Sequence, residues 1–304
     1  MIQVTGVTKT FRRKVAVSDM SFAVASGKVT GFLGPNGAGK STTMRIMAGL
    51  DHGEGQVLYD DKPLLAHPRP SNVVGILLEA KAFHPTRRAR DHLRVLAAQG
   101  GVSESRVDEV LDMVGLHDVA KKRPGKFSLG MSQRLGIAAA ILGRPSHLIL
   151  DEPANGLDPE GIAWLRRFIK DYADQGNAVF VSSHLLSEMS QMADDVVVIG
   201  KGKIIANTTI NELLQSKGSA ETVVRTAQLD KLAEALRQEK YDFQQQGEQI
   251  IVRGQISDTI GEVAFRANIP LLELSSRSAS LEDVFLQLTE SAEEFTSGAG
   301  GTKQ

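Results

Sequence analysis

A glycine-rich segment reads Gly34-Pro35-Asn36-Gly37-Ala38-Gly39-Lys40-Ser41 and fits the pattern G-x-x-x-x-G-K-[ST]. It follows the apolar run 29–33, and residues 41–49 can form a helix directly after it. Glycines let successive backbone N–H groups converge on phosphate oxygens, and the N-terminus of the following helix favours negative charge. A chance glycine turn capped by serine has no reason to stand between a strand and a helix. The segment therefore predicts a nucleotide-phosphate site, with Lys40 at the β- and γ-phosphates and the Ser41 hydroxyl on Mg²⁺.

Two carboxylates, Asp151 and Glu152, follow the apolar run 148–150. Ligands of open α/β sheets bind at the carboxyl ends of strands, so we expect both acids beside the phosphate loop. Asp151 suits the coordination network of a Mg²⁺·nucleotide. Glu152 suits the acceptance of a proton from an attacking water. By themselves, two acids after an apolar run are more often a strand that leads into a loop, and the phosphate loop is what favours the hydrolytic interpretation.

The composition excludes several classes of protein. The chain has 304 residues, no cysteine and a net charge of −1, which suggests about two domains without disulfides, thiolate metal sites or cysteine nucleophiles. The near-neutral charge argues against a nucleic-acid partner. No stretch approaches the ~18 apolar residues that span a bilayer, and the N-terminus lacks a signal peptide. We therefore expect an intracellular, soluble chain that another protein holds at any membrane where it works.

The order of apolar and polar segments indicates an α/β fold. Runs that are apolar on both faces fit parallel strands covered by helices, and residues 86–143 are expected to form a helical lobe. In this lobe, Ser103 is the predicted N-cap of a helix. The apolar face of that helix carries Val107, Val110, Leu111 and Val114. The expected strands are 2–7, 15–24, 29–33, 56–59, 148–150 and 178–181, followed by a terminal hairpin over 196–206.

A second domain is expected after the polar stretch 215–220, which has the composition of a linker. The order there is β-α-β-β-α-β, which is typical of a small ferredoxin-like α+β domain. The expected elements are strands 221–226, 241–245, 249–253 and 271–275, and helices 229–238, 257–267 and 281–288. The predicted domains are thus 1–215 and 216–290, and the glycine-rich tail 291–304 is expected to be disordered.

Residues 1 to about 215 resemble the nucleotide-binding (ATPase) subunit of an ABC transporter. The segment 127–134, Phe-Ser-Leu-Gly-Met-Ser-Gln-Arg, is similar to the family signature L-S-G-G-Q and precedes a helix expected over 135–142. The segment 155–158, Asn-Gly-Leu-Asp, resembles the D-loop. His184 stands at the place of the switch histidine, and Phe11 where the family sets an aromatic ring against adenine. The resemblance implies a P-loop NTPase core of the ABC type, with a mostly parallel sheet, an antiparallel β subdomain and a helical lobe.

The resemblance also implies a set of site residues and two cofactors, ATP and Mg²⁺. The implied catalytic residues are Lys40, Glu152 and His184, and the implied metal contacts are Ser41, Glu79 and Asp151. The implied nucleotide contacts are Phe11, Gly34, Pro35, Asn36, Gly37, Ala38, Gly39, Lys40, Ser41, Thr42, Ser128, Gly130, Met131 and Asp158. Ser128 and Gly130 would act on the ATP bound by a second copy, in a head-to-tail dimer that sandwiches two ATP molecules.

The sequence departs from the family pattern at two places. Leu129 and Met131 replace a glycine and a glutamine of the signature, and such S-L-G-M variants are typical of the antibiotic-exporter branch that includes bacitracin- and daunorubicin-resistance ATPases. Glu79 replaces the Q-loop glutamine. A carboxylate can still serve Mg²⁺, but it loses the amide donors and adds a negative charge. We expect Glu79 to alter the Mg²⁺ dependence, and an unchanged dependence in Glu79→Gln would contradict this.

The function implied is that of an ATPase that drives an ABC exporter from the cytoplasmic face of the membrane. Its partners would be a second copy of the chain and an integral-membrane permease, with no nucleic acid. The segment 281–288, similar to the L-E-D-x-F-L ending of prokaryotic exporter ATPases, agrees with this. One alternative is a soluble ABC ATPase that acts on ribosomes or DNA, and another is a nucleotide-dependent regulator without turnover. The transported substrate, whether antibiotic, drug or lipid-like, is not encoded in these residues.

Overall fold

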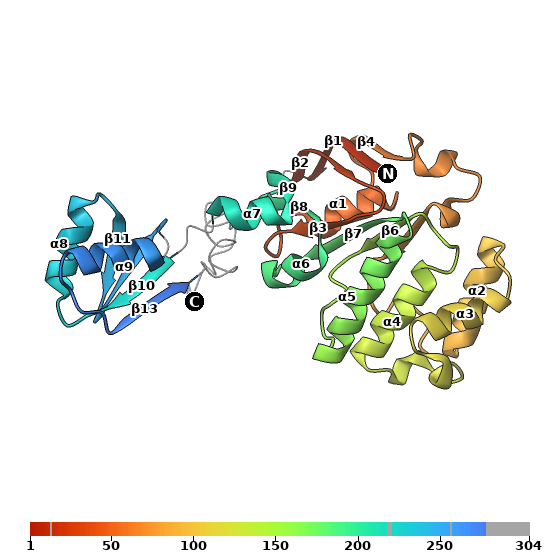
Figure 1. The fold of residues 1–304 in the computed structure, drawn as a ribbon. Helices are drawn as coiled ribbons and strands as arrows, with labels where there is room; N and C mark the ends of the chain where they lie inside the picture. Colours follow the sequence, from red (N-terminus) through yellow and green to blue (C-terminus); the bar gives the residue numbers. More distant parts are fainter. Residues whose placement is uncertain (13, 218–220, 256, 278–304) are drawn as a thin grey trace, which may run out of the picture. The chain divides into compact units, whose positions relative to one another are not determined.

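The computed structural model describes residues 1–12, 14–217, 221–255 and 257–277 (Figure 1). Their contacts divide the chain into two compact units, one from Met1 to Ile210 and a second that begins at Asn211. The sequence prediction put the boundary five residues later, after 215. Each unit has its own sheet and its own core, and we describe them separately.

A six-stranded sheet forms the centre of the first unit, in the order β5-β6-β7-β3-β8-β9. All neighbouring strands are parallel except β9, which is antiparallel to β8. Every residue of β3, β6 and β7 is buried, as expected for strands covered on both faces. The strands are β3 (Val29–Leu33), β5 (Val74–Leu77), β6 (His147–Leu150), β7 (Ala178–Ser183), β8 (Asp195–Gly200) and β9 (Lys203–Thr209).

A three-stranded antiparallel sheet lies beside it, in the order β2-β1-β4. Its strands are β1 (Ile2–Phe11), β2 (Lys14–Val24) and β4 (Glu54–Tyr59). Three phenylalanine rings join the two sheets. Phe22 of β2 lies with its ring centroid 5.7 Å from that of Phe32 and 5.3 Å from that of Phe180, and the latter two rings are 5.0 Å apart. This aromatic cluster packs β2 against β3 and β7.

Helices surround the central sheet and form a separate lobe (Figure 1). Helix α1 follows the phosphate loop, α5 and α6 pack against the sheet, and α2, α3 and α4 build the lobe. The α-helices of this part are α1 (Lys40–Met47), α2 (Ala89–Gly100), α3 (Ser105–Met113), α4 (Leu129–Ala140), α5 (Pro159–Asp174) and α6 (Leu186–Met192). Helix α7 (Ile210–Lys217) begins at the last residue of the first unit and continues into the second. Short 3-10 turns are Leu64–Ala66, Pro70–Asn72, His117–Val119 and Pro124–Lys126.

Three sequence predictions about helix boundaries are wrong. The helix expected to start at 135 begins at Leu129, because the Ser128 hydroxyl caps it by accepting the Met131 N–H at 3.1 Å. Ser103 is not the cap of α3. That helix has Glu104 at its N-cap, and the Ser103 hydroxyl lies 2.9 Å from the Ser105 hydroxyl. The predicted linker is helical over 215–217, which belong to α7. The predicted apolar face of α3 is confirmed, since Val107, Val110, Leu111 and Val114 are all buried.

The second unit has the predicted ferredoxin-like order. Its strands pair only antiparallel, in the order β11-β12-β10-β13, and α8 and α9 contribute to one core with Val224 and Ile250. The elements are β10 (Glu221–Arg225), α8 (Leu229–Gln238), β11 (Asp242–Gln246), β12 (Gln249–Arg253), α9 (Ser257–Arg266) and β13 (Glu273–Arg277). The predicted helix 281–288 and the predicted tail 291–304 lie outside the described residues.

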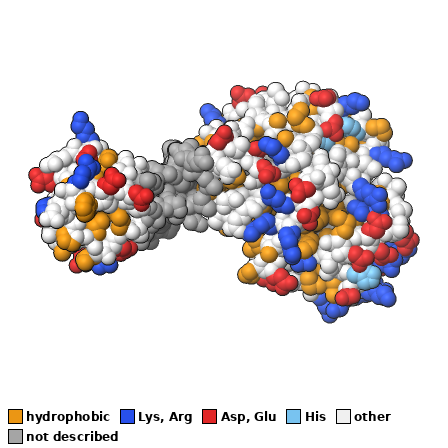
Figure 2. Space-filling model, in the orientation of Figure 1, with side chains coloured by type: hydrophobic (Ala, Val, Ile, Leu, Met, Phe, Trp, Pro, Cys, Tyr) orange, Lys and Arg blue, Asp and Glu red, His pale blue; other side chains and the backbone are white. Residues whose placement is uncertain are grey.

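The surface carries both signs of charge. Figure 2 shows lysine and arginine side chains interspersed with aspartate and glutamate on one face of the first unit, in keeping with the net charge of −1. No helix within the described part of the chain combines the length and the apolar character needed to cross a membrane.

The aromatic cluster generates a stability prediction. Phe180→Ala should lower the free energy of unfolding of the first unit by about 3–5 kcal/mol, because it opens a cavity between two sheets. Leu65→Ala is the control within the same unit, since that side chain is 88% exposed. It should change the free energy by no more than about 0.5 kcal/mol. Urea unfolding of both variants measures the difference, and equal losses would contradict the packing described.

Candidate functional site

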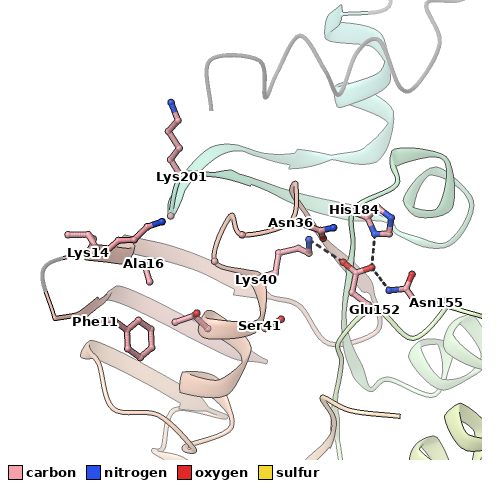
Figure 3. A pocket seen from close by; sticks show the side chains of 15 residues that line it. Phe11, Lys14, Ala16, Asn36, Lys40, Ser41, Glu152, Asn155, His184 and Lys201 are labelled. Atoms are coloured by element: carbon pink, nitrogen blue, oxygen red, sulfur yellow. Dashed lines mark hydrogen bonds and ion pairs between the residues drawn. The ribbon is translucent and has the colours of Figure 1, made fainter. Parts of the chain in front are cut away.

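A cleft of about 390 Å³ opens at the carboxyl edge of the central sheet (Figure 3). The phosphate loop follows β3, the two acids follow β6, His184 follows β7, and the turn between β8 and β9 closes one side. Parallel strands bring these segments to the same edge. The cleft is lined by Phe11, Lys14, Val15, Ala16, Asn36, Gly37, Gly39, Lys40, Ser41, Thr42, Glu152, Asn155, His184, Lys201 and Gly202.

The phosphate loop is held in place by β2 and by the β8–β9 turn. Gly39 has a φ of 108°, and a Cβ there would lie 2.8 Å from the Ala16 carbonyl oxygen. A Cβ on Gly202 would lie 2.5 Å from the same oxygen. The Gly202 N–H donates to the carbonyl of Ala38 at 3.0 Å. Only glycine allows this close approach, so the loop is pre-shaped by its neighbours.

The Lys40 side chain is buried, and its ammonium has several partners. Its Nζ donates to the carbonyl oxygen of Gly34 at 2.6 Å and to that of Pro35 at 3.3 Å. The same nitrogen lies 3.1 Å from Glu152 Oε1. A buried ammonium is tolerated only with such compensation. The loop thus holds its cation at the centre of the cleft.

The side chain of Glu152 lies at the meeting point of the cleft residues (Figure 3). Its Oε2 accepts a hydrogen bond from Asn155 Nδ2 at 3.3 Å and lies 2.9 Å from His184 Nδ1, which donates when it carries the proton. Its Oε1 is buried, and no described residue donates a hydrogen bond to it, although Lys40 Nζ is close. That oxygen is therefore oriented but has lone pairs for a further donor.

A serine on β7 forms hydrogen bonds with both Asp151 and Glu152. The Ser182 hydroxyl accepts the backbone N–H of Glu152 at 2.8 Å and donates to Asp151 Oδ1 at 2.5 Å. Glu152 itself has a φ of 47°, in the left-handed region that costs a non-glycine residue of order 1 kcal/mol or more. The hydrogen bond from its N–H helps to hold this conformation, which turns the carboxylate toward Lys40.

Phe11 lies at the outer end of the cleft, where β1 ends (Figure 3). Its ring is 49% exposed, and Lys9 Nζ lies 5.0 Å from the ring centroid. An aromatic ring exposed to this degree has a free face on which a planar base can stack. The structure thus places Phe11 at the same cleft as the phosphate loop.

Several predicted residues lie away from this cleft. Ser128, Gly130 and Met131 form the cap and first turn of α4. Asp158 caps α5, where its Oδ1 accepts the Gly161 N–H at 2.9 Å. Glu79 is exposed after β5 and does not line the cleft. The roles predicted for these residues toward a nucleotide therefore need a second chain or a change of conformation, and they stay predictions.

The donor set fits Mg²⁺ bound together with a phosphate chain. The Ser41 hydroxyl and the Asp151 carboxylate supply oxygen atoms, which are the ligands that Mg²⁺ prefers. In the described part of the chain, no group of three or more histidine, aspartate or glutamate side chains could hold a metal ion by itself. Mg²⁺ usually keeps one or two protein carboxylates and takes its other ligands from water and phosphate. This is the arrangement that Ser41 and Asp151 allow.

Six lining residues are not among the predicted site residues. Lys14, Val15 and Ala16 come from β2, Asn155 from the D-loop, and Lys201 and Gly202 from the β8–β9 turn. The turn was predicted as a turn, but its place beside the phosphate loop follows from the pairing of β3 with β8. Nothing local in the sequence reports that pairing.

Comparisons with known proteins agree with this architecture. The family described as ABC transporter matches residues 17–155, and a domain of unknown function (DUF8746) matches residues 220–282. The bacitracin transport ATP-binding protein BcrA of Bacillus licheniformis is 35% identical over 301 residues, which cover 95% of this chain and 97% of that protein. The uncharacterized ABC transporter ATP-binding protein YhcH of Bacillus subtilis (strain 168) is 34% identical over 97% of both chains. The lantibiotic transport ATP-binding protein SrtF of Streptococcus pyogenes is 37% identical over 67% of this chain and 89% of its own.

Solved structures share the fold. An ATP-binding subunit of an ABC transporter superposes with a TM-score of 0.65 at 26% identity, over 72% of this chain and 93% of its own. A dimeric ATP-binding cassette in a post-hydrolysis state with ADP and Pi gives a TM-score of 0.63 at 23% identity, over 69% and 99%. The latter likeness concerns the fold alone.

The serine that ties the acids gives a prediction for this site. Ser182→Ala removes a buried donor and acceptor at once, and it should lower the free energy of unfolding by about 1–3 kcal/mol. Ser190→Ala is the matched control, because the Ser190 hydroxyl donates only to a carbonyl within its own helix, that of Ser187. Its effect should be about 1 kcal/mol or less. Denaturant unfolding measures both, and a neutral Ser182→Ala would contradict the network.

Proposed function

Because this chain belongs to the family of ABC transporter ATP-binding proteins, we propose that it is the ATP-hydrolysing subunit of an exporter. The enzyme binds and hydrolyses ATP. We further propose that two copies form a head-to-tail dimer around two Mg·ATP and drive a separately encoded permease from the cytoplasmic face of the membrane. BcrA is named a bacitracin transport ATP-binding protein and SrtF a lantibiotic transport ATP-binding protein, and these names support an antibiotic-like peptide as the substrate class.

The observation that carries the proposal is the convergence of Lys40, Glu152 and His184 in one cleft (Figure 3). A phosphate loop alone would serve any nucleotide-binding protein. A carboxylate oriented by a histidine and an amide, with one oxygen left for a further donor, serves hydrolysis. The intact carboxylate therefore favours turnover over a regulator that only binds nucleotide.

Nucleotide binding would exchange the partners of Lys40. Its ammonium now contacts two loop carbonyls and Glu152 Oε1. The β- and γ-phosphates carry more negative charge than a carboxylate and would take over this cation, supported by the loop N–H groups and the start of α1. Glu152 would then lose its ion pair, which frees its Oε1 to accept a hydrogen bond from a water at the time when the substrate is in place.

Mg²⁺, when bound with ATP, neutralises charge on the β- and γ-phosphate oxygens. Ser41 and Asp151 are the residues that would hold it, and Ser182 orients the Asp151 carboxylate through its hydrogen bond to Oδ1. Glu79 is the further metal contact that the sequence predicts, and it would have to move into the cleft. The chemistry of these oxygen ligands supports the assignment.

The hydrolytic step needs a water positioned and deprotonated. The oxygen of the water bonds to the γ-phosphorus, and Glu152 accepts a proton from that water. At the same time the bond between the γ-phosphorus and the bridging oxygen breaks, which releases ADP and phosphate. Lys40 stabilises the charge that develops on the phosphate oxygens. His184 and Asn155 keep the carboxylate in its rotamer through their contacts with Oε2. Positioning and charge stabilisation supply most of the acceleration in such reactions.

Substitution of the proposed base tests the enzyme directly. Glu152→Gln should reduce steady-state ATP hydrolysis by at least about 100-fold, because an amide cannot accept the proton, while ATP affinity changes little. Glu234→Gln, an exposed glutamate of α8 in the second unit, is the control and should hydrolyse at the rate of the unmodified chain. Wild-type turnover in Glu152→Gln would remove Glu152 from its assigned role.

The transport role is tested by what co-purifies with the chain. Tagged protein solubilised from native membranes in mild detergent should retain a stoichiometric partner with about six hydrophobic spans, each of about 20 apolar residues. Recovery from the soluble fraction alone, or with ribosomes or DNA, would contradict the exporter role and favour a soluble ABC ATPase. The Glu152→Gln protein serves as a second bait, since a trapped ATP-bound state should not release that partner.

A further inference from the structure

Two segments that are distant in the sequence interlock through leucine and glycine. The signature segment (residues 128–131) contributes Leu129 and Gly130, and the D-loop (residues 155–158) contributes Gly156 and Leu157. A Cβ on Gly156 would overlap Leu129 Cδ2 and lie 2.9 Å from Leu129 Cγ. A Cβ on Gly130 would lie 3.2 Å from Leu157 Cδ2. Each leucine thus lies over the glycine of the other segment.

This reciprocal contact accounts for the departure of the signature from its usual pattern. Leu129 stands where the signature usually has glycine, and it is 42% exposed, so burial in the core does not explain it. In its present rotamer the side chain occupies space that a Cβ on residue 156 would fill. Gly156 also has a φ of 74°, which glycine adopts without strain. Leu129 and Gly156 are therefore one matched pair.

Both segments are anchored to helices that are joined to each other. Ser128 caps α4 and Asp158 caps α5, each through a side-chain acceptor for a backbone N–H. The guanidinium of Arg134 on α4 lies 4.3 Å from the ring centroid of Trp164 on α5. A cation over an indole face at this distance is attractive by about 0.5–2 kcal/mol. The interlock therefore lies at the end of two helices that already have a fixed relation.

The D-loop leads directly to the proposed base. Asn155 donates from Nδ2 to Glu152 Oε2 at 3.3 Å and from its backbone N–H to the Glu152 carbonyl at 3.2 Å. Residue 155 is adjacent to Gly156 in the chain. A displacement of the signature segment would thus reach Gly156, then Asn155, and then the carboxylate of Glu152.

We propose that Leu129 and Gly156 are positioning residues that make the signature segment and the D-loop move as one unit. When the signature segment closes on the ATP held by a second copy, the interlock sets Asn155 and Glu152 of its own chain for hydrolysis. In this way, ATP bound at the partner's site controls the position of Glu152, the proposed base, in the chain whose signature segment contacts that ATP. The inference rests on the proposed function and adds a residue-level route to it.

A rescue experiment tests the interlock. Gly156→Ala should lower kcat for ATP by about 10- to 100-fold, because misplacement by about 1 Å costs that much. Its ATP affinity, measured on the monomer, should stay within about 2-fold, since the phosphate loop is untouched. The double variant, which combines Leu129→Ala with Gly156→Ala, removes the overlap between the two side chains. Its kcat should recover to within about 3-fold of that of Leu129→Ala alone, because substitutions of residues in contact are not additive.

Gly101→Ala is the matched control for backbone strain. Gly101 has a φ of 64°, and a Cβ there would meet no atom within 4 Å. It should keep the kcat of the unmodified chain although it carries the same kind of strain. Equal kcat in Gly156→Ala and Gly101→Ala would overturn the proposal, and so would a double variant no faster than Gly156→Ala.

A second variant guards against misfolding. Leu157→Ala removes the contact with Gly130 without any overlap, so it should fold, lower kcat by about 3- to 10-fold, and show non-additivity with Leu129→Ala in kcat, as contacting residues do. Additive effects would overturn the proposal. The unmodified chain distinguishes the two levels of inference: if it does not hydrolyse ATP, the proposed function fails, whereas a failed rescue in an active enzyme contradicts the interlock alone.

Discussion

The ion pair between Lys40 and Glu152 is the contact on which the rest of the site depends. A buried ammonium requires compensating oxygens, and here they come from the loop after β3 and from the acid after β6. Strand β7 lies between β3 and β6 in the sheet. It supplies Ser182, and His184 follows it directly; these two residues orient the two acids. The sheet order therefore brings the cation, the base and its supports to one edge, and nucleotide phosphates can replace the carboxylate as partners of Lys40.

The interlock of the signature segment with the D-loop changes how departures from a family pattern are interpreted. Leu129 alone looks like a loss of the flexible glycine of the signature. In the structure it is matched by Gly156, which leaves room for its side chain. The two positions are 27 residues apart in the chain, and only the fold brings them into contact. Under the proposed coupling, Leu129 changes how the two segments move together, and Ser128 and Gly130 stay predicted contacts of the phosphates.

Local sequence patterns predicted those helices and strands whose own residues show which side chains are buried and where the element ends. The bounds of β3, α8 and β12 agree with prediction, because apolar runs and amphipathic periodicity mark them. Strand β5 was not expected, since it has only four residues and is recognised by its pairing with β6. The start of α4 was missed because the signature segment looks like a loop until Ser128 is seen to cap it. Ser103 was an attractive cap by type, but the chain enters α3 two residues later.

By itself, the sequence determined the phosphate loop, the pair of acids and the ferredoxin-like order of the second unit, because residue type and spacing fix that chemistry locally. The tertiary structure decided which other residues share the cleft: Ala16 and Lys14 from β2, Lys201 and Gly202 from the β8–β9 turn, and Asn155 beside the base. It also decided that Leu129 packs on Gly156. These neighbours follow from the pairing of β3 with β7 and β8 and from the packing of helices, and hydrogen bonds between distant strands leave no local pattern in the sequence.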